Sequence, residues 1–184
     1  MIEVIAFIGE AGSGKDTLLR RVATECPDVH EIVSCTTRPP REGEVDGVNY
    51  HFLTGEEFGE KVLRNEMLEA TCFNDWFYGT SIDALDKEKM NVCVLNPAGV
   101  ESMLQYHKQI NLTVFYIQAT EKERLIRQLN RETNPDIDEV IRRLKADRID
   151  FSELDFDYVA LANNTKEDLE RNVTIIKSVI KGLK

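Results

Sequence analysis

The sequence predicts an α/β protein with a mostly parallel sheet flanked by helices. Short apolar segments of strand length alternate along the chain with longer segments whose apolar residues recur at helical spacing. The first apolar segment is followed by a glycine-rich turn and then by one of the helical segments. Strands that alternate with helices pair in parallel, because each helix returns the chain to the same end of the sheet.

The first predicted strand spans residues 2–8, where almost every side chain is apolar. A helix follows and ends at Pro27, because proline lacks the N–H group that a helix interior needs. Its buried face is marked by Leu18, Leu19, Val22, Ala23 and Cys26. Two further buried strands are predicted at 92–95 and 112–117. The helix between them has a face formed by Val100, Met103, Leu104 and His107.

The C-terminal third continues the same alternation. Residues 121–132 predict a helix, which Thr133, Asn134 and Pro135 interrupt. Another helix begins at Ile137, and residues 158–161 form the last predicted strand. The closing helix has an apolar face formed by Leu169, Val173, Ile176, Ile180 and Leu183.

Residues 34–90 break this alternation. They contain short extended pieces, a turn of hairpin type at Asp46-Gly47 and a helix near residues 56–65. We therefore expect one domain that spans residues 1–184, with a core at 1–33 and 91–184 and an insertion at about 34–90.

Composition argues against several classes of protein. The chain has 184 residues and a formal net charge of −10, so it lacks the basic face that binding to nucleic acid requires. No apolar run reaches the roughly 20 residues of a membrane helix, and residues 1–9 do not resemble a secretory signal. The four cysteines are scattered, without the spacing of a disulfide framework or a zinc site. We expect a cytoplasmic protein that binds neither nucleic acid nor membranes.

The glycine-rich turn after the first strand fits the phosphate-binding pattern G-x-x-x-x-G-K from Gly9 to Lys15. Glycines let successive N–H groups turn toward phosphate oxygens, and the following helix adds the positive end of its dipole. Lys15 supplies a mobile charge for the β- and γ-phosphates. The pattern indicates a P-loop NTPase fold. The predicted ATP-binding residues are Gly9, Gly12, Ser13, Gly14, Lys15, Asp16 and Thr17.

The position after Lys15 departs from this pattern, which has a serine or threonine there to hold Mg²⁺. Asp16 occupies the position, and the hydroxyl comes one residue later, at Thr17. Asp16 would bind Mg²⁺ directly or through water, or would serve as a favourable acid at a helix start. Both Asp16 and Thr17 are candidate metal ligands.

The segment Arg38-Pro39-Pro40-Arg41 indicates a second anion site. Residues before proline favour extended or polyproline geometry, in which positions three apart lie on the same side. Two guanidinium groups on a stiff segment can both bind one phosphate. The alternative is a solvated basic turn. The phosphate loop upstream favours an anion site, because a kinase also needs a place for its acceptor.

The residues from Val33 to Thr80 resemble the nucleoside monophosphate (NMP) binding region of guanylate kinases. The resemblance is carried by the run from Ser34 to Phe52 (SCTTRPPREGEVDGVNYHF), by Asn65 to Glu69 (NEMLE) and by Tyr78-Gly79-Thr80. It extends more loosely over the whole chain. It implies an ATP-dependent kinase that phosphorylates an NMP, most simply GMP or dGMP, with Mg²⁺.

The resemblance also implies roles for individual residues. Arg38 and Arg41 would hold the acceptor phosphate, with Tyr50 and Tyr78 hydrogen-bonded to it. Glu69 would accept hydrogen bonds from guanine N1 and N2, which suits a carboxylate and disfavours adenine. The purine would further be contacted by Ser34 and Thr80. For the two tyrosines, half-buried core packing is an open alternative.

Six arginines crowd the two helices around Asn134, in the region that the resemblance makes a lid at about 131–143. Arg131, Arg142 and Arg143 would stabilise the transferring phosphoryl group, together with Lys15. Pairing with acids four residues away on exposed helix faces would explain Arg124, Arg127 and Arg148.

The sequence departs from the guanylate kinase pattern near Asn96, where family members usually carry an Asp-x-Asp segment. Other acceptors therefore stay open, such as another deoxynucleotide or a ribosyl bisphosphate. A guanylate-kinase-like binding module without activity is a further alternative. Lys15 and its glycines favour an enzyme. We expect small-molecule nucleotides as partners and a monomer or homodimer.

Overall fold

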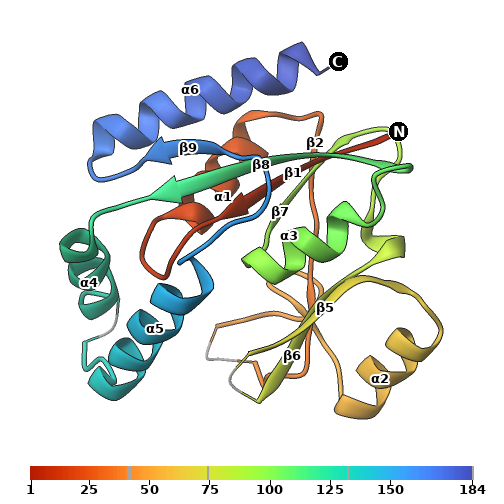
Figure 1. Cartoon of the computed structure of the whole chain (residues 1–184), viewed down its shortest axis with the longest axis horizontal. Coiled ribbons are helices and arrows are strands. Elements are labelled where there is room, and N and C mark those ends of the chain that lie inside the picture. Colours follow the sequence, from red (N-terminus) through yellow and green to blue (C-terminus); the bar gives the residue numbers. More distant parts are fainter. Residues whose placement is uncertain (41–42, 74, 132, 184) are drawn as a thin grey trace. The chain divides into compact units, whose positions relative to one another are not determined.

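The structure, a computed structural model, describes residues 1–40, 43–73, 75–131 and 133–183 (Figure 1). The chain forms two compact units. Unit 1 consists of Met1–Ile5, Asp28–Cys93 and Ala98–Leu112. Unit 2 consists of Ala6–Pro27, Val94–Pro97 and Thr113–Lys184. Among the described residues no helix is long and apolar enough to cross a membrane.

A five-stranded sheet has the strand order β2-β7-β1-β8-β9. Its strands are β1 (Ile2–Ile8), β2 (Val29–Glu31), β7 (Met90–Val94), β8 (Ile110–Gln118) and β9 (Val159–Ala162). β2 is parallel to β7, and β8 is parallel to β9. The α/β class with a mostly parallel sheet is therefore confirmed. Three predicted strands are shifted by one or two residues at their ends. An apolar run shows which residues are buried, whereas a strand end is set by where its backbone hydrogen bonds stop.

The helices of unit 2 begin at side-chain caps, except the first of them, which begins after Gly14 without one. They are α1 (Lys15–Glu25), α4 (Glu121–Leu129), α5 (Ile137–Asp150) and α6 (Lys166–Gly182). The side chains of Thr120, Asp136 and Thr165 accept hydrogen bonds from the first turns of α4, α5 and α6. Because each cap satisfies an N–H group that the helix itself cannot pair, these residues fix where the helices start.

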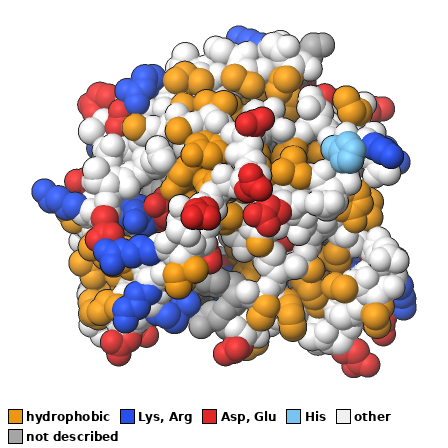
Figure 2. Space-filling view, in the orientation of Figure 1, with side chains coloured by type: hydrophobic (Ala, Val, Ile, Leu, Met, Phe, Trp, Pro, Cys, Tyr) orange, Lys and Arg blue, Asp and Glu red, His pale blue; other side chains and the backbone are white. Residues whose placement is uncertain are grey.

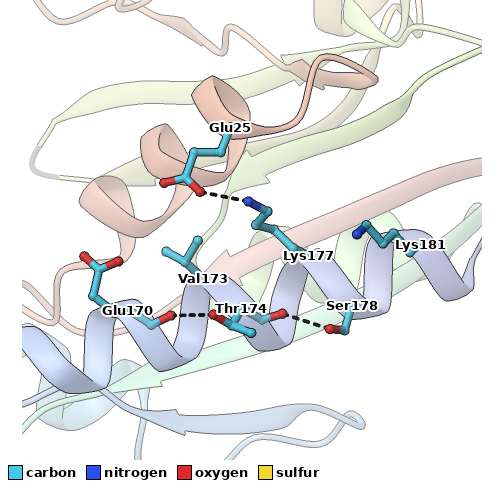
Figure 3. Close-up of a pocket in the computed structure, with 7 residues that line it drawn as sticks. All are labelled: Glu25, Glu170, Val173, Thr174, Lys177, Ser178 and Lys181. Atoms are coloured by element: carbon cyan, nitrogen blue, oxygen red, sulfur yellow. Dashed lines mark hydrogen bonds and ion pairs between the residues drawn. The ribbon is translucent and has the colours of Figure 1, made fainter.

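Helix α1 buries Leu18, Leu19 and Val22 of its predicted face, whereas Ala23 and Cys26 are half-buried and Cys26 lies just after the helix. Helix α1 also contacts α6. Ion pairs join the two helices at the surface. Lys177 reaches Glu25 from α6, as Figure 3 shows, and Arg21 of α1 is paired with Glu170 at 2.9 Å. Exposed pairs of this kind contribute little to stability, so the buried apolar face holds α1 in place.

Unit 1 contains a four-stranded sheet of order β4-β3-β6-β5. Its strands are β3 (Cys35–Thr36), β4 (His51–Phe52), β5 (Met67–Phe73) and β6 (Trp76–Ser81). Helix α2 (Gly55–Leu63) covers it, and its Phe58 packs in a buried cluster with Cys35 and Met67. The short 3-10 helix η1 (Ile82–Ala84) follows β6, and helix α3 (Pro97–Leu104) follows β7.

Two local predictions are wrong. Asp46 and Gly47 do form a turn, with φ at +73° for Gly47 and its N–H donating to Tyr50 O over 2.8 Å. The turn is not a hairpin, because the flanking strands β3 and β4 run parallel. Helix α3 ends at Leu104, and His107 lies exposed in the turns that follow. Turn residues specify a local bend, whereas strand direction depends on pairing partners that are distant in sequence.

Candidate active site

The phosphate loop connects β1 to α1 in unit 2, as predicted. Gly12 and Gly14 have φ angles of +81° and +90°, which favour glycine. A side chain at either position would also collide with its surroundings. A Cβ atom on Gly12 would lie 2.6 Å from Arg124 O, and one on Gly14 would lie 2.5 Å from Asn163 Nδ2. The pattern therefore needs glycine here for the backbone angle and for the close approach of α4 and of the residues after β9.

Arg127 of α4 binds the loop through its backbone carbonyl groups. Its Nη1 donates to the oxygens of Gly12 and Ser13, both at 3.2 Å. Its Nη2 donates to the oxygens of Asn163 and Asn164, at 2.8 and 2.9 Å. One guanidinium group thus joins the loop to the segment that follows β9.

Two amide side chains hold loop carbonyls in the same way. Gln128 Nε2 donates to Ala11 O at 3.3 Å, and Asn163 Nδ2 donates to Ser13 O at 2.8 Å. The carbonyl groups of three consecutive loop residues are therefore bound by surrounding side chains. This arrangement favours N–H groups that face the opposite side of the loop, which is the concave arrangement that binds phosphate.

Lys15, Asp16 and Thr17 begin α1. The Lys15 side chain is 18% exposed, and its Nζ lies 3.7 Å from a carboxylate oxygen of Asp16, which is 62% exposed. Both residues lie in the first turn of α1, where the positive end of the helix dipole attracts an anion. Asp16 and Thr17 offer a carboxylate and a hydroxyl oxygen, the type of donor that Mg²⁺ prefers, so their chemistry fits this ion. Among the described residues no group of three or more His, Cys, Asp or Glu side chains could hold a metal. A magnesium ion here would therefore need phosphate oxygens and water to complete its shell.

The prediction for three arginines of α4 and α5 is wrong. Arg124 is buried and lies between Glu10 of the loop and Asp147 of α5, at 3.7 and 3.2 Å. Arg127 binds backbone carbonyls, as described above. Arg148 does form an exposed ion pair, but its partner is Glu121 of α4 and not an acid of its own helix. Helical spacing identifies neighbours on one helix and carries no information on the loop that packs against it.

Two of the predicted lid arginines converge on one acid. Arg142 Nε and Arg143 Nε donate to Glu139, at 2.6 and 2.7 Å. These hydrogen bonds, first that of Arg142, lower the pKa of Glu139 to about 2. Arg131 lies exposed after α4. Figure 2 shows Lys and Arg side chains interleaved with Asp and Glu over α4 and α5. This surface therefore carries both positive and negative side chains.

In unit 1, Arg38 is held firmly beside an aromatic pair. Its side chain is 10% exposed, and Nη2 lies 2.9 Å from both carboxylate oxygens of Glu44. The guanidinium carbon lies 5.6 Å from the Tyr50 ring centre and 5.8 Å from that of Phe52. The basic segment is thus not a solvated turn at Arg38. Arg41 lies outside the described residues.

The remaining residues of the predicted acceptor site lie on the sheet of unit 1 or next to it. Tyr50 and Tyr78 meet edge to face, with ring centres 6.1 Å apart. Ser34 directly precedes β3, and its carbonyl oxygen accepts the His51 N–H at 2.9 Å. Tyr78 lies opposite Thr36 in the β3–β6 pairing. The structure therefore brings the two tyrosines and Arg38 together.

Glu69 and Thr80 face each other across β5 and β6. The Thr80 hydroxyl donates to Glu69 Oε1 at 2.8 Å. Thr80 is 0% exposed and Glu69 is 7% exposed. Burial raises the pKa of the Glu69 carboxyl to about 7, although the hydrogen bonds of Thr80 act in the opposite direction. A buried carboxyl whose charge changes near neutral pH is a candidate ligand group. Asn96 lies half-buried between β7 and α3.

Several residues that hold the phosphate loop were not predicted from the sequence in this role, namely Glu10, Arg124, Arg127, Gln128, Asp147 and Asn163. One signal was available. Arg124, Arg127 and Gln128 lie three and four residues apart, so they share one face of α4. A polar face on a short helix near a phosphate loop could have indicated contacts with that loop.

Comparison with known proteins identifies the family. The family model described as guanylate kinase matches residues 1–182. A guanylate kinase from Helicobacter hepaticus is 31% identical over 183 residues, which cover 96% of this chain and 90% of that protein. One from Campylobacter jejuni (strain RM1221) is 31% identical over 173 residues, which cover 91% and 84%.

A solved structure supports the same fold. The crystal structure of guanylate kinase from Anaplasma phagocytophilum matches with a TM-score of 0.67 and 21% identity. The match covers 98% of this chain and 86% of that one. With the family match over nearly every residue and relatives that align over most of their own length, this chain belongs to the guanylate kinase family.

Proposed function

We propose that this chain transfers the γ-phosphoryl group of ATP to GMP or dGMP and forms the diphosphate. The observation that carries the proposal is the buried Glu69, which is hydrogen-bonded to Thr80 across two strands. Guanine presents two adjacent donors, N1–H and the N2 amino group, which match the two oxygens of one carboxylate. Adenine presents an acceptor at N1, so the same carboxylate would repel it.

The phosphate loop would bind ATP. Its glycines, Ser13 and Lys15 would contact the phosphates, because the carbonyl groups of Ala11, Gly12 and Ser13 are bound from outside. Mg²⁺ would be held by Asp16 and Thr17 together with phosphate oxygens, and when bound it would neutralise charge between the β- and γ-phosphates. Asp16 is exposed, so it can contact the ion directly or through water.

The acceptor phosphate would bind at Arg38, Arg41, Tyr50 and Tyr78. The support comes from Arg38, whose guanidinium is oriented by Glu44 and by the rings of Tyr50 and Phe52. A fixed guanidinium loses little freedom when it binds phosphate, which favours affinity. Ser34 would complete the contacts to the purine. The insertion at about 34–90 would therefore be the NMP-binding region.

Arg131, Arg142 and Arg143 would neutralise charge on the phosphoryl group during transfer, as a lid at about 131–143. An acceptor phosphate is already a nucleophile, so no protein base is needed, and catalysis would rest on position and charge. The pairing of Arg142 and Arg143 with Glu139 supports this role only in part. During transfer, Arg142 or Arg143 would have to leave Glu139 and bind the phosphoryl oxygens instead.

The test is turnover with a panel of acceptors. ADP formation from ATP and Mg²⁺ would be measured with GMP, dGMP, AMP, CMP, UMP and dTMP, with Lys15→Ala as a control. We expect Lys15-dependent turnover confined to GMP and dGMP. Turnover with another acceptor would refute the role of Glu69. Absence of turnover in a folded protein would refute the kinase proposal. Gel filtration would test the predicted monomer or homodimer, and the cytoplasmic location stays a prediction.

A further inference from the structure

A buried charge network joins the phosphate loop to α4 and α5. Arg124 of α4 has a side chain only 5% exposed and lies between Glu10 and Asp147, whose side chains are 17% and 16% exposed. Ion pairs removed from water are costly unless every charge is matched, so a buried arginine with two acids is not an incidental surface contact.

Asp147 also binds the loop itself. Its Oδ2 accepts a hydrogen bond from the Ala11 N–H at 2.9 Å, across 136 residues of sequence. The side chains of Arg127, Gln128 and Asn163 bind loop carbonyls, whereas Asp147 binds a loop N–H. A carboxylate that accepts from a backbone amide here is the same kind of contact that phosphate makes with such a loop.

Several polar atoms around this network are buried without a hydrogen-bond partner among the described residues. They are Glu10 Oε2, Ser13 Oγ, Arg124 Nε, Gln128 Oε1 and Asn163 Oδ1. Each belongs to the loop or to a side chain that contacts the loop or its network. Unsatisfied buried polar atoms are uncommon in proteins, and a cluster of them beside a ligand-binding loop is where bound water or ligand would supply partners.

We propose that Asp147 is a positioning residue for ATP, acting through the Ala11 amide and through Arg124. It fixes the first half of the phosphate loop and ties this loop to α5, the helix that carries Arg142 and Arg143. The inference rests on the proposed function for the identity of the ligand. A loop that is held in its binding geometry before ATP arrives loses less freedom on binding.

Two substitutions separate this role from simple packing. Asp147→Ala removes the acceptor for the Ala11 N–H, and we expect the Kd for ATP to rise about tenfold, the effect of roughly one charge-assisted hydrogen bond. Asp147→Asn keeps an acceptor oxygen and leaves Arg124 with Glu10 as a neutral pair. We expect its Kd for ATP to rise less than threefold. The kcat with GMP should fall for Asp147→Ala, while the KM for GMP stays within twofold of wild type.

Val140→Ala is the matched control, because Val140 is a buried apolar residue of the same helix. ATP binding would be measured by calorimetry without an acceptor, and Tm by thermal unfolding. If Asp147→Ala does not fold, Asp147→Ser would replace it, since its shorter side chain keeps a polar group but ends farther from Ala11. The inference is overturned if the alanine or serine variant binds ATP like wild type. It is also overturned if Val140→Ala lowers Tm as much as the Asp147 variant does and raises the Kd for ATP by the same factor.

Failure of the proposed function is a different result. Wild-type protein that shows no Lys15-dependent binding of ATP would refute the nucleotide kinase itself. Wild-type binding that Lys15→Ala abolishes and Asp147→Ala leaves unchanged would refute only the role of Asp147.

Discussion

The raised pKa of Glu69 leads to a quantitative prediction for Glu69→Gln. In the folded protein the carboxyl has a pKa of about 7, against an ordinary value of 4.5. Between these pH values the folded state keeps a proton that the unfolded state has released. Stability therefore falls as pH rises through this window, since the folded state binds more protons. At 1.36 kcal/mol per pH unit, the free energy of unfolding should drop by about 3 kcal/mol.

The assay is urea unfolding of wild type and Glu69→Gln at several pH values between 4.5 and 8. Glutamine has nearly the same shape and can still accept the Thr80 hydroxyl, but it does not titrate. We expect the difference between the two proteins to change by about 3 kcal/mol across the window, in favour of the variant at high pH. Parallel stability curves would refute the assignment of a protonated, buried Glu69.

Binding of guanine should show the opposite trend, because two guanine donors require the ionised carboxylate. Affinity of wild type for GMP should rise about tenfold per pH unit up to about pH 7 and then level off. The phosphate of GMP also titrates near pH 6. Glu69→Gln keeps this second dependence, so the comparison isolates Glu69. If both proteins show the same pH profile, Glu69 does not accept hydrogen bonds from guanine.

Three further substitutions test the phosphate loop and the acceptor site. Gly12→Ala should lower Tm by several degrees and weaken ATP binding, because φ is +81° and the new Cβ would lie 2.6 Å from Arg124 O; unchanged Tm in calorimetry would contradict this geometry. Arg127→Ala should cost about 2–4 kcal/mol in urea unfolding, since four backbone carbonyls lose a donor, and a loss below 0.5 kcal/mol would argue against these bonds. Arg38→Lys should raise the KM for GMP about 10- to 100-fold in initial rates, with the KM for ATP as the internal control, because lysine cannot form the fork that Glu44 orients.

The phosphate loop could be predicted in detail because its determinants are contiguous in sequence. The required glycines, the lysine and the flanking strand and helix all lie within residues 2–25. The helix starts were predictable for the same reason, since Thr120 and Asp136 are local signals that act within one turn. The parallel sheet followed from the alternation of elements, which constrains topology without reference to any single contact.

The supports of the loop could not be predicted, because their partners are far apart in sequence. Asp147 lies 136 residues from Ala11, and Arg127 lies 114 residues from Ser13. On sequence alone Arg124 and Arg127 have acids at helical spacing, so exposed pairing is the local expectation. Tertiary contact overrides it. The hairpin predicted at Asp46-Gly47 is wrong for a related reason, because the parallel pairing of β3 and β4 depends on residues on both sides of the turn.

The acidic composition and the anionic ligands are compatible because of where the cations lie. The chain has 33 acidic and 23 basic residues, yet the arginines that contact the loop are directed to backbone carbonyls or to half-buried acids. Arg127 fixes the loop without contributing an exposed charge, and Arg124 is matched by Glu10 and Asp147. The net field at the loop thus depends on Lys15, the N–H groups and the helix dipole. A phosphate-binding loop of this kind needs positive potential over only a few ångströms, which a chain with a net charge of −10 can provide.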